Sequence, residues 1–144
     1  MQAEALSKIR KLAGEAFHNT VVFLAYAYGS RISGRARPDS DLDMGYYLHP
    51  SCGVQSLPIE EEMLLAARLS RRLGVEVDLR SLDTAPLELR GRVLEDGARI
   101  YCSDDVARVS LETAVLAQYH DYKPMFEAMH SSRLLSMAGA VNGG

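Results

Sequence analysis

Asp41 and Asp43 stand two residues apart in the segment DLDMGYYL, residues 41–48, whose apolar and aromatic residues predict a strand. Side chains at i and i+2 of a strand leave the same face, so the two carboxylates should share one small space. Carboxylates held that close repel each other unless a cation lies between them. So few oxygen ligands suit Mg²⁺, which keeps waters and completes its octahedron with substrate phosphates. The pair therefore predicts a divalent-metal site with Asp41 and Asp43 as ligands.

A Gly-Ser pair, Gly29-Ser30, precedes Asp41 by a gap of ten residues. Gly29 has no Cβ where a backbone must approach a ligand closely, and Ser30 offers a hydroxyl and N–H groups where a strand ends and a helical turn begins. Such groups bind phosphate. Either pair alone is usually structural, but the combination is far more specific. The loop between them should bring the phosphate-binding pair and the metal-binding pair face to face across one cleft.

Three arginines, Arg31, Arg35 and Arg37, lie in the loop between the two pairs. Their planar side chains match phosphate and carboxylate oxygens, so they could reach the outer phosphates of a nucleotide or an acidic surface of a partner. The alternative is that they are solvated loop charges. Arg31 is the candidate for nucleotide binding because it adjoins Ser30.

A third carboxylate is expected from the segment VEVDLRSL, residues 75–82, which alternates strictly between apolar and charged residues. The alternation predicts a half-buried strand with Asp78 on its polar face. In a small sheet this strand would neighbour the one carrying Asp41 and Asp43, which makes Asp78 the natural third metal ligand. Glu76 and Asp83 are nearby competitors for that role.

These residues require a scaffold of alternating helices and strands. Hydrophobic periodicity, Pro58 at a helix start and Gly74 beyond a helix end predict helices over residues 3–18, 58–73, 86–95 and from 104 onward. Strands are expected over residues 21–28, 41–48, 75–82 and 99–102. The order predicts one α/β (α+β) domain, residues 1–137, in which helices flank a small mixed sheet. Pro124 should kink or divide the last helix, and residues 138–144 should form a flexible tail.

The composition excludes several classes of protein. Apolar residues make up 47% and charged residues 24% of the 144 residues, as in an average globular protein, and no run is long enough to span a membrane. The net charge of −3 disfavours a protein that coats nucleic acid, so no direct nucleic-acid partner is expected. Without an export signal the chain is expected to be cytoplasmic, with Cys52 and Cys102 as reduced thiols.

The combination Gly29-Ser30, ten residues, Asp41-x-Asp43 resembles the motif of the DNA polymerase β-like nucleotidyltransferases, and the short length resembles their minimal nucleotidyltransferase (MNT) branch. Residues 85–112 and YHDYKP, residues 119–124, resemble the second half of the MNT antitoxins that pair with HEPN toxins, so the resemblance covers nearly the whole chain. It implies a polymerase β-like fold and transfer of AMP from ATP to a tyrosine hydroxyl of a HEPN ribonuclease, with which the chain could form a hetero-oligomer.

Carried over by position, the resemblance implies that Gly29 and Ser30 bind the triphosphate of ATP, that Asp41 and Asp43 bind Mg²⁺, and that Asp78 completes the carboxylate triad. Two alternatives stay open. The chain could modify a small molecule such as an aminoglycoside, or an RNA end, although the first usually needs an additional helical domain and the second a more basic surface. It could also be a non-catalytic antitoxin that neutralises its partner by binding, although the acids of the site are intact.

Overall fold

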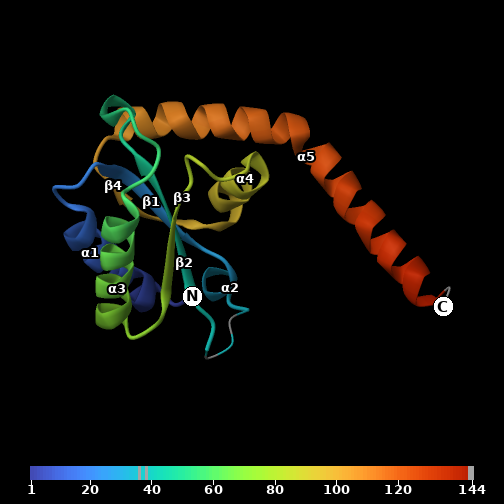
Figure 1. Ribbon diagram of the computed structural model, residues 1–144, viewed down its shortest axis with the longest axis horizontal. Helices are drawn as coiled ribbons and strands as arrows, with labels where there is room; N and C mark the ends of the chain where they lie inside the picture. Colours follow the sequence, from blue (N-terminus) through green and yellow to red (C-terminus); the bar gives the residue numbers. More distant parts are fainter. Residues whose placement is uncertain (36, 38, 143–144) are drawn as a thin grey trace.

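The computed structural model describes residues 1–35, 37 and 39–142, with side chains up to residue 133. Figure 1 labels the helices and strands that follow along the chain. They are α1 (Ala3–Phe17), β1 (Val22–Tyr28), α2 (Ser30–Ser33), β2 (Leu42–Leu48), the 3-10 turn η1 (Pro50–Cys52), α3 (Ile59–Leu73), β3 (Val77–Ser81), α4 (Leu87–Asp96), β4 (Ala98–Cys102) and α5 (Asp105–Asn142). Every helix and strand expected from the sequence is present, with ends shifted by at most a few residues.

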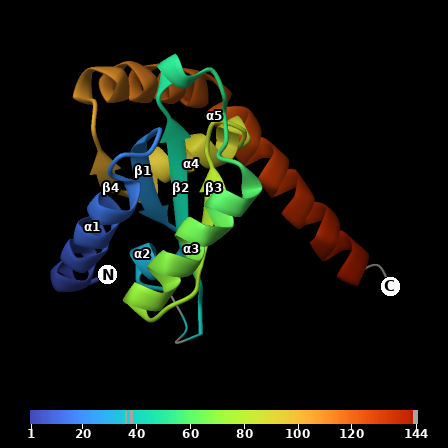
Figure 2. The same cartoon turned by 60° about the vertical axis from the view of Figure 1, so that its left-hand side comes forward.

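The four strands form one mixed sheet in the order β3-β2-β1-β4. β1 is antiparallel to both β2 and β4, whereas β2 and β3 are parallel. Figure 2 shows the strands side by side, with α3 in front of β2 and β3. The α/β class with a small mixed sheet is therefore confirmed. Because β1 and β2 are antiparallel neighbours, the end of β1 lies next to the start of β2.

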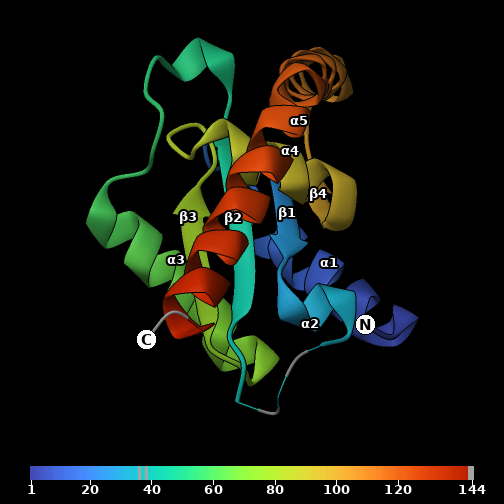
Figure 3. The ribbon, with the colours of Figure 1, turned by 90° about the vertical axis from the view of Figure 1, so that its right-hand side faces the viewer.

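Both faces of the sheet are covered, which explains the continuous apolar run of β1. One face carries the side chains of Met44, Tyr46 and Leu79, which pack with apolar residues of α1 and α3. The other face carries Tyr26 and Tyr47, which belong to a second cluster with residues of α4. Figure 3 shows α4 on the side of this second face, with the first part of α5 beside α4 at the end of the sheet. Six of the seven residues of β1 are buried, as expected for a strand covered on both sides.

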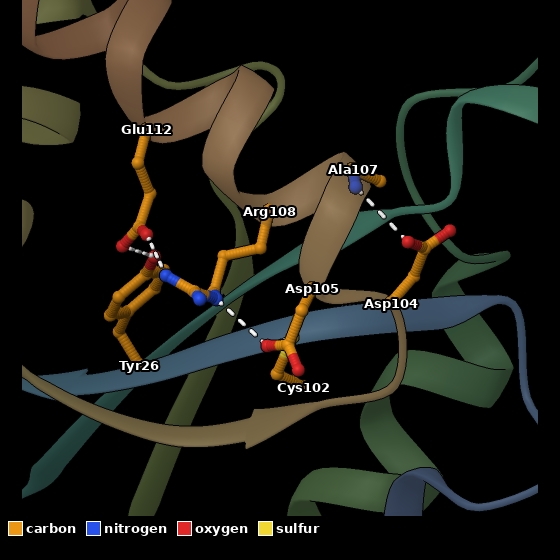
Figure 4. A network of polar contacts seen from close by, with 7 residues as sticks. All are labelled: Tyr26, Cys102, Asp104, Asp105, Ala107, Arg108 and Glu112. Atoms are coloured by element: carbon orange, nitrogen blue, oxygen red, sulfur yellow. Dashed lines mark hydrogen bonds and ion pairs between the residues drawn. The ribbon is translucent and has the colours of Figure 1, made fainter.

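Polar contacts fix the first turns of α5 to the sheet (Figure 4). The Asp104 carboxylate accepts the Ala107 N–H at 3.0 Å and so caps the helix. One helical turn further on, Arg108 pairs with Asp105 and with Glu112. The hydroxyl of Tyr26, a residue of β1, donates to the other oxygen of Glu112 at 2.7 Å. The contacts with β1 and the loop before α5 set the direction in which the long helix leaves the sheet.

The second half of α5 projects away from the rest of the molecule after a bend that Figures 1 and 2 both show. Pro124 lies inside the helix, where it lacks the N–H for a helical hydrogen bond. The expected kink is therefore present, within a continuous helix. The helix extends to Asn142, and residues 143–144 lie outside the described residues. The division into a domain of residues 1–137 and a flexible tail stays a prediction. Within the described chain, no helix has the length and apolar character needed to cross a membrane.

Candidate active site

The Gly-Ser pair and the acids meet at the end of β1. Tyr28, the last residue of β1, lies directly opposite Asp43 of β2. The next residue, Gly29, has φ +85° and ψ −164°, a backbone conformation essentially restricted to glycine. A Cβ built on Gly29 would overlap the Oδ2 atom of Asp43. Glycine is thus required here both for its backbone angles and for the contact between this turn and the carboxylate.

Ser30 begins the short helix α2, the helical turn expected from the sequence. The N–H groups of Ile32 and Ser33 both donate to the Gly29 carbonyl at 3.1 Å, and the Arg35 N–H donates to the Ser30 carbonyl at 2.9 Å. These bonds fold the turn without using the Ser30 hydroxyl. Gly29 and Ser30 line a cavity of about 670 Å³ between this turn and α4. The cavity gives the Gly-Ser pair an open side on which a ligand could lie.

Asp43 and Asp78 lie directly opposite each other on the parallel strands β2 and β3. Burial raises the pKa of Asp43, the Asp78 carboxylate raises it further, Arg80 lowers it, and Asp41 adds a smaller increase. Asp41 itself is exposed and precedes the first residue of β2. The structure therefore gathers the three predicted carboxylates into one region of negative potential, at the edge of which Asp78 and Arg80 form an ion pair of 3.6 Å.

Of the two competitors for the third carboxylate, Asp83 lies elsewhere, whereas Glu76 lies next to the site, where its carbonyl accepts the Leu42 N–H at 2.8 Å. Asp83 follows β3 and accepts the N–H of Leu48, at the far end of β2 from Asp43, at 3.0 Å. Glu76 precedes β3 and is exposed. The register of β2 and β3 thus favours Asp78 as the partner of Asp43. The catalytic and metal-binding roles of Asp41, Asp43 and Asp78 stay predictions.

A magnesium ion is compatible with this donor set. Within the side chains that the structure describes, no three His, Cys, Asp or Glu residues already converge in a metal-binding arrangement. Mg²⁺ does not need such a cage, because it commonly binds through one or two carboxylates, several waters and the phosphates of a substrate. Asp41 and Asp43 lie beside the turn that carries Ser30, so carboxylate and phosphate oxygens could reach one ion. The raised pKa of Asp43 marks a carboxylate that a nearby cation would stabilise in its charged form.

The three arginines of the loop occupy different positions around the site. The Nε of Arg31 donates to the carbonyl of Ser40, the residue before Asp41, so this side chain ties the start of the loop to its end. Arg35 lines the cavity next to Ser30. Arg37 is exposed, and its backbone N–H donates to the Ser40 hydroxyl at 2.9 Å. Nucleotide binding by Arg31 stays a prediction, whereas its contact with Ser40 gives it a clear part in positioning Asp41.

Several residues of the cavity were not predicted from the sequence, among them Tyr28, Arg92 and Asp96. Tyr28 lies at the cavity wall beside Gly29, and Arg92 reaches the same cavity from α4. The sequence did contain a hint in Gly91, a glycine inside a helix. A Cβ there would run into the ring of Tyr119, so Gly91 allows α5 to pack closely on α4 and leaves Arg92 to face the cavity. Arg92 is far from Ser30 along the chain, so the sequence did not show that the two residues are neighbours.

The comparisons with known proteins place the chain in a class of nucleotidyltransferases. The family model described as polymerase beta, nucleotidyltransferase matches residues 10–106. This match covers more than half of the chain, which therefore belongs to the polymerase β nucleotidyltransferase family. The comparison with curated proteins gave no match.

Several solved structures share the fold. A toxin-antitoxin complex with AMP-PNP contains a chain that is 21% identical, with a TM-score of 0.64, over 90% of this chain and 98% of that one. A tri-AMPylated Shewanella oneidensis HEPN toxin in complex with an MNT antitoxin gives 20% identity and a TM-score of 0.61, over 93% and 99%. A structure described as a minimal nucleotidyltransferase gives 27% identity and a TM-score of 0.54, over 67% and 94%.

Proposed function

We propose that this chain is an antitoxin that transfers AMP from ATP to a tyrosine hydroxyl of a HEPN-family ribonuclease toxin. The observation that carries the proposal is the contact between Gly29 and the Asp43 carboxylate, which joins a phosphate-binding turn to an acid cluster beside an open cavity. The similar structures support the choice of reaction, since one contains AMP-PNP and another a tri-AMPylated HEPN toxin bound to an MNT antitoxin.

Each residue has a definite part in the proposed reaction. Gly29 and Ser30 hold the triphosphate of ATP, and Arg35 and Arg92 offset its negative charge and that of Asp96 at the cavity wall. Asp41 and Asp43 would hold Mg²⁺. When bound, this metal supplies positive charge to the phosphates and to the departing pyrophosphate.

The acceptor is the oxygen of a tyrosine hydroxyl. This oxygen attacks the α-phosphorus of ATP in line with the bond to pyrophosphate, so one P–O bond forms while another breaks. A carboxylate oxygen of Asp78 accepts the hydroxyl proton. The position of Asp78 beside Asp43, near the edge of the sheet, is suited to this part because it leaves room for an acceptor on the outer side.

The proposal is tested by co-expressing the chain with a HEPN protein, adding ATP and Mg²⁺ to the purified mixture, and measuring the intact mass of the HEPN protein. We expect the mass to increase by whole AMP units on tyrosine. Asp41→Asn and Asp43→Asn should each reduce the transfer rate by at least about 100-fold, since even residues that only support metal ligands contribute up to that factor. Asp39→Asn, a change in an exposed residue of the same loop, should transfer AMP at the wild-type rate.

Two results would overturn the proposal in different ways. An unmodified HEPN protein after incubation with the active wild-type chain would exclude AMP transfer to this partner. If Asp41→Asn and Asp43→Asn still neutralised the toxin in cells, neutralisation by binding would be the better account.

A further inference from the structure

A second cavity lies on the other side of the acid pair from Ser30. It has a volume of about 560 Å³, and Asp78 and Arg80 of β3 line it together with Ile59 and Glu62 of α3. Across the sheet, Gly29 contacts Asp43, Asp43 lies opposite Asp78, and Asp78 lines this second cavity. β3 is an edge strand, so the cavity opens at the side of the molecule. The carboxylates therefore separate two cavities, of which only the first contains the phosphate-binding turn.

An exposed apolar surface adjoins the second cavity. Ile59 and Met63 are 66% and 65% exposed, although both are large apolar residues. They are four residues apart on α3 and so lie on one side of that helix, the side from which Glu62 also reaches the cavity. We name Ile59 and Met63 the α3 strip. Ile59 lines the cavity and Met63 extends the exposed apolar surface along α3, and a continuous apolar surface beside a cavity can serve as a protein-interaction site.

The first turn of α3 adds negative charge beside the strip. Glu60 and Glu61 are exposed and form no ion pair within the described part of the chain, while Glu62 accepts a hydrogen bond from Tyr46. A protein that binds RNA needs Lys and Arg side chains against the phosphates. The surface around a ribonuclease active site is accordingly basic. The glutamates that border the apolar strip are complementary to such a surface in charge.

We infer that the second cavity and the α3 strip are the docking surface for the acceptor segment of the protein partner. The acceptor tyrosine enters the cavity with its hydroxyl toward Asp78, apolar side chains of the partner pack on Ile59 and Met63, and its basic side chains face Glu60 and Glu61. ATP then occupies the first cavity, and the reacting groups meet between the two. This inference rests on the proposed function, because it names the route by which the acceptor of that reaction arrives.

A rival surface exists on α5. Tyr122, Met125 and Met129 are also exposed, at 47%, 49% and 53%. These residues line neither the cavity that contains Asp78 nor the cavity that contains Ser30. They therefore provide a matched control: an apolar helical surface of similar exposure that has no connection to the acids.

The test compares two double variants, Ile59→Arg with Met63→Arg and Met125→Arg with Met129→Arg. For the α3 variant we expect the rate of AMP transfer to the HEPN protein to fall by about tenfold or more, as for central residues of an interface. Its affinity for ATP with Mg²⁺, measured by calorimetry, should match the wild type, because the substituted residues lie outside the first cavity. The α5 variant should match the wild type in both measurements.

Wild-type transfer rates for the α3 variant, or loss of transfer in the α5 variant alone, would overturn the inference. A photo-crosslinking residue placed at position 59 or at position 125 separates docking from chemistry. Crosslinks to the HEPN protein from position 59 and none from position 125 support the docking surface even if the wild-type chain transfers no AMP, in which case only the proposed reaction fails. Crosslinks from position 125 alone exclude it.

Discussion

Gly29 is the residue on which the site most depends, because its backbone angles and its contact with Asp43 both exclude a side chain. The gap of ten residues to Asp41 made this turn recognisable in the sequence. The contact itself was not readable there, because it depends on how β1 and β2 pair. The antiparallel register that sets Tyr28 opposite Asp43 brings Gly29 to the carboxylate.

Gly29→Ala should damage both the fold and the activity. A non-glycine residue that adopts the backbone angles of Gly29 destabilises the fold by on the order of 1–3 kcal/mol, and the overlap of its Cβ with Asp43 adds to that cost. We therefore expect a lower free energy of unfolding in urea and a loss of AMP transfer. The control is Gly53→Ala, where φ is +75° but a Cβ would meet open space. That variant should lose about 1 kcal/mol and keep its transfer rate. Equal losses of stability and activity in the two variants would contradict this explanation.

At the residue scale, the sequence could not decide which residue is the third carboxylate. Alternation in VEVDLRSL predicted correctly that Asp78 is exposed and that Val77 and Leu79 are buried. A shift of the strand by two residues preserves that alternation, so the pattern could not distinguish Asp78 from Glu76. The pairing of Asp43 with Asp78 comes from the register of the parallel strands, which depends on contacts between segments far apart in the sequence.

At the scale of secondary-structure elements, the correct predictions came from long periodic patterns and from residues that mark the ends of helices. The helix start at Pro58 and its end before Gly74 agree with α3, since each is fixed by local backbone chemistry. The turn η1 was not predicted, because three residues are too few to show a period. The bend of α5 follows from Pro124, but the direction in which the helix runs depends on Tyr26 and Glu112, which are distant in the sequence.

The stability that the start of α5 gives to the native state should depend on pH because of Asp104. Hydrogen bonds from the Ala107 N–H and from His49 hold the pKa of Asp104 below its ordinary value of 3.8. A lowered folded-state pKa stabilises the native state above the unfolded-state pKa, and this stabilisation is lost as the pH falls through the folded-state value. Asp104→Ala should therefore lower the urea midpoint at pH 7, and its difference from the wild type should shrink below about pH 4.

The control for Asp104→Ala is Asp121→Ala, a change at an exposed position further along α5. Its urea midpoint should stay close to that of the wild type at both pH values. A difference between Asp104→Ala and the wild type that is the same at pH 7 and at pH 3 would show that the carboxylate charge does not stabilise the start of the helix.

At the scale of the molecule, the fold divides its sheet into a face for stability and a face for chemistry. α1 and α3 pack on the first face, with the larger cluster of buried residues. Asp43 and Asp78 leave the second face, where α4 covers only part of the sheet and leaves the cavity beside Ser30. The mutual repulsion of the acids is thus concentrated where a bound ligand can offset it, so the stability of the whole chain should depend on that ligand.

Addition of ATP with Mg²⁺ should therefore raise the melting temperature of the wild-type chain. A ligand at 100 times its dissociation constant stabilises the native state by about 2.7 kcal/mol, which for a domain of this size corresponds to roughly 5–10 °C. Differential scanning fluorimetry measures this shift. EDTA should abolish most of it, and Asp43→Asn should show little shift, because the carboxylate proposed to bind the metal is absent. A full shift in EDTA, or in Asp43→Asn, would mean that ATP binds without the metal site assigned to Asp41 and Asp43.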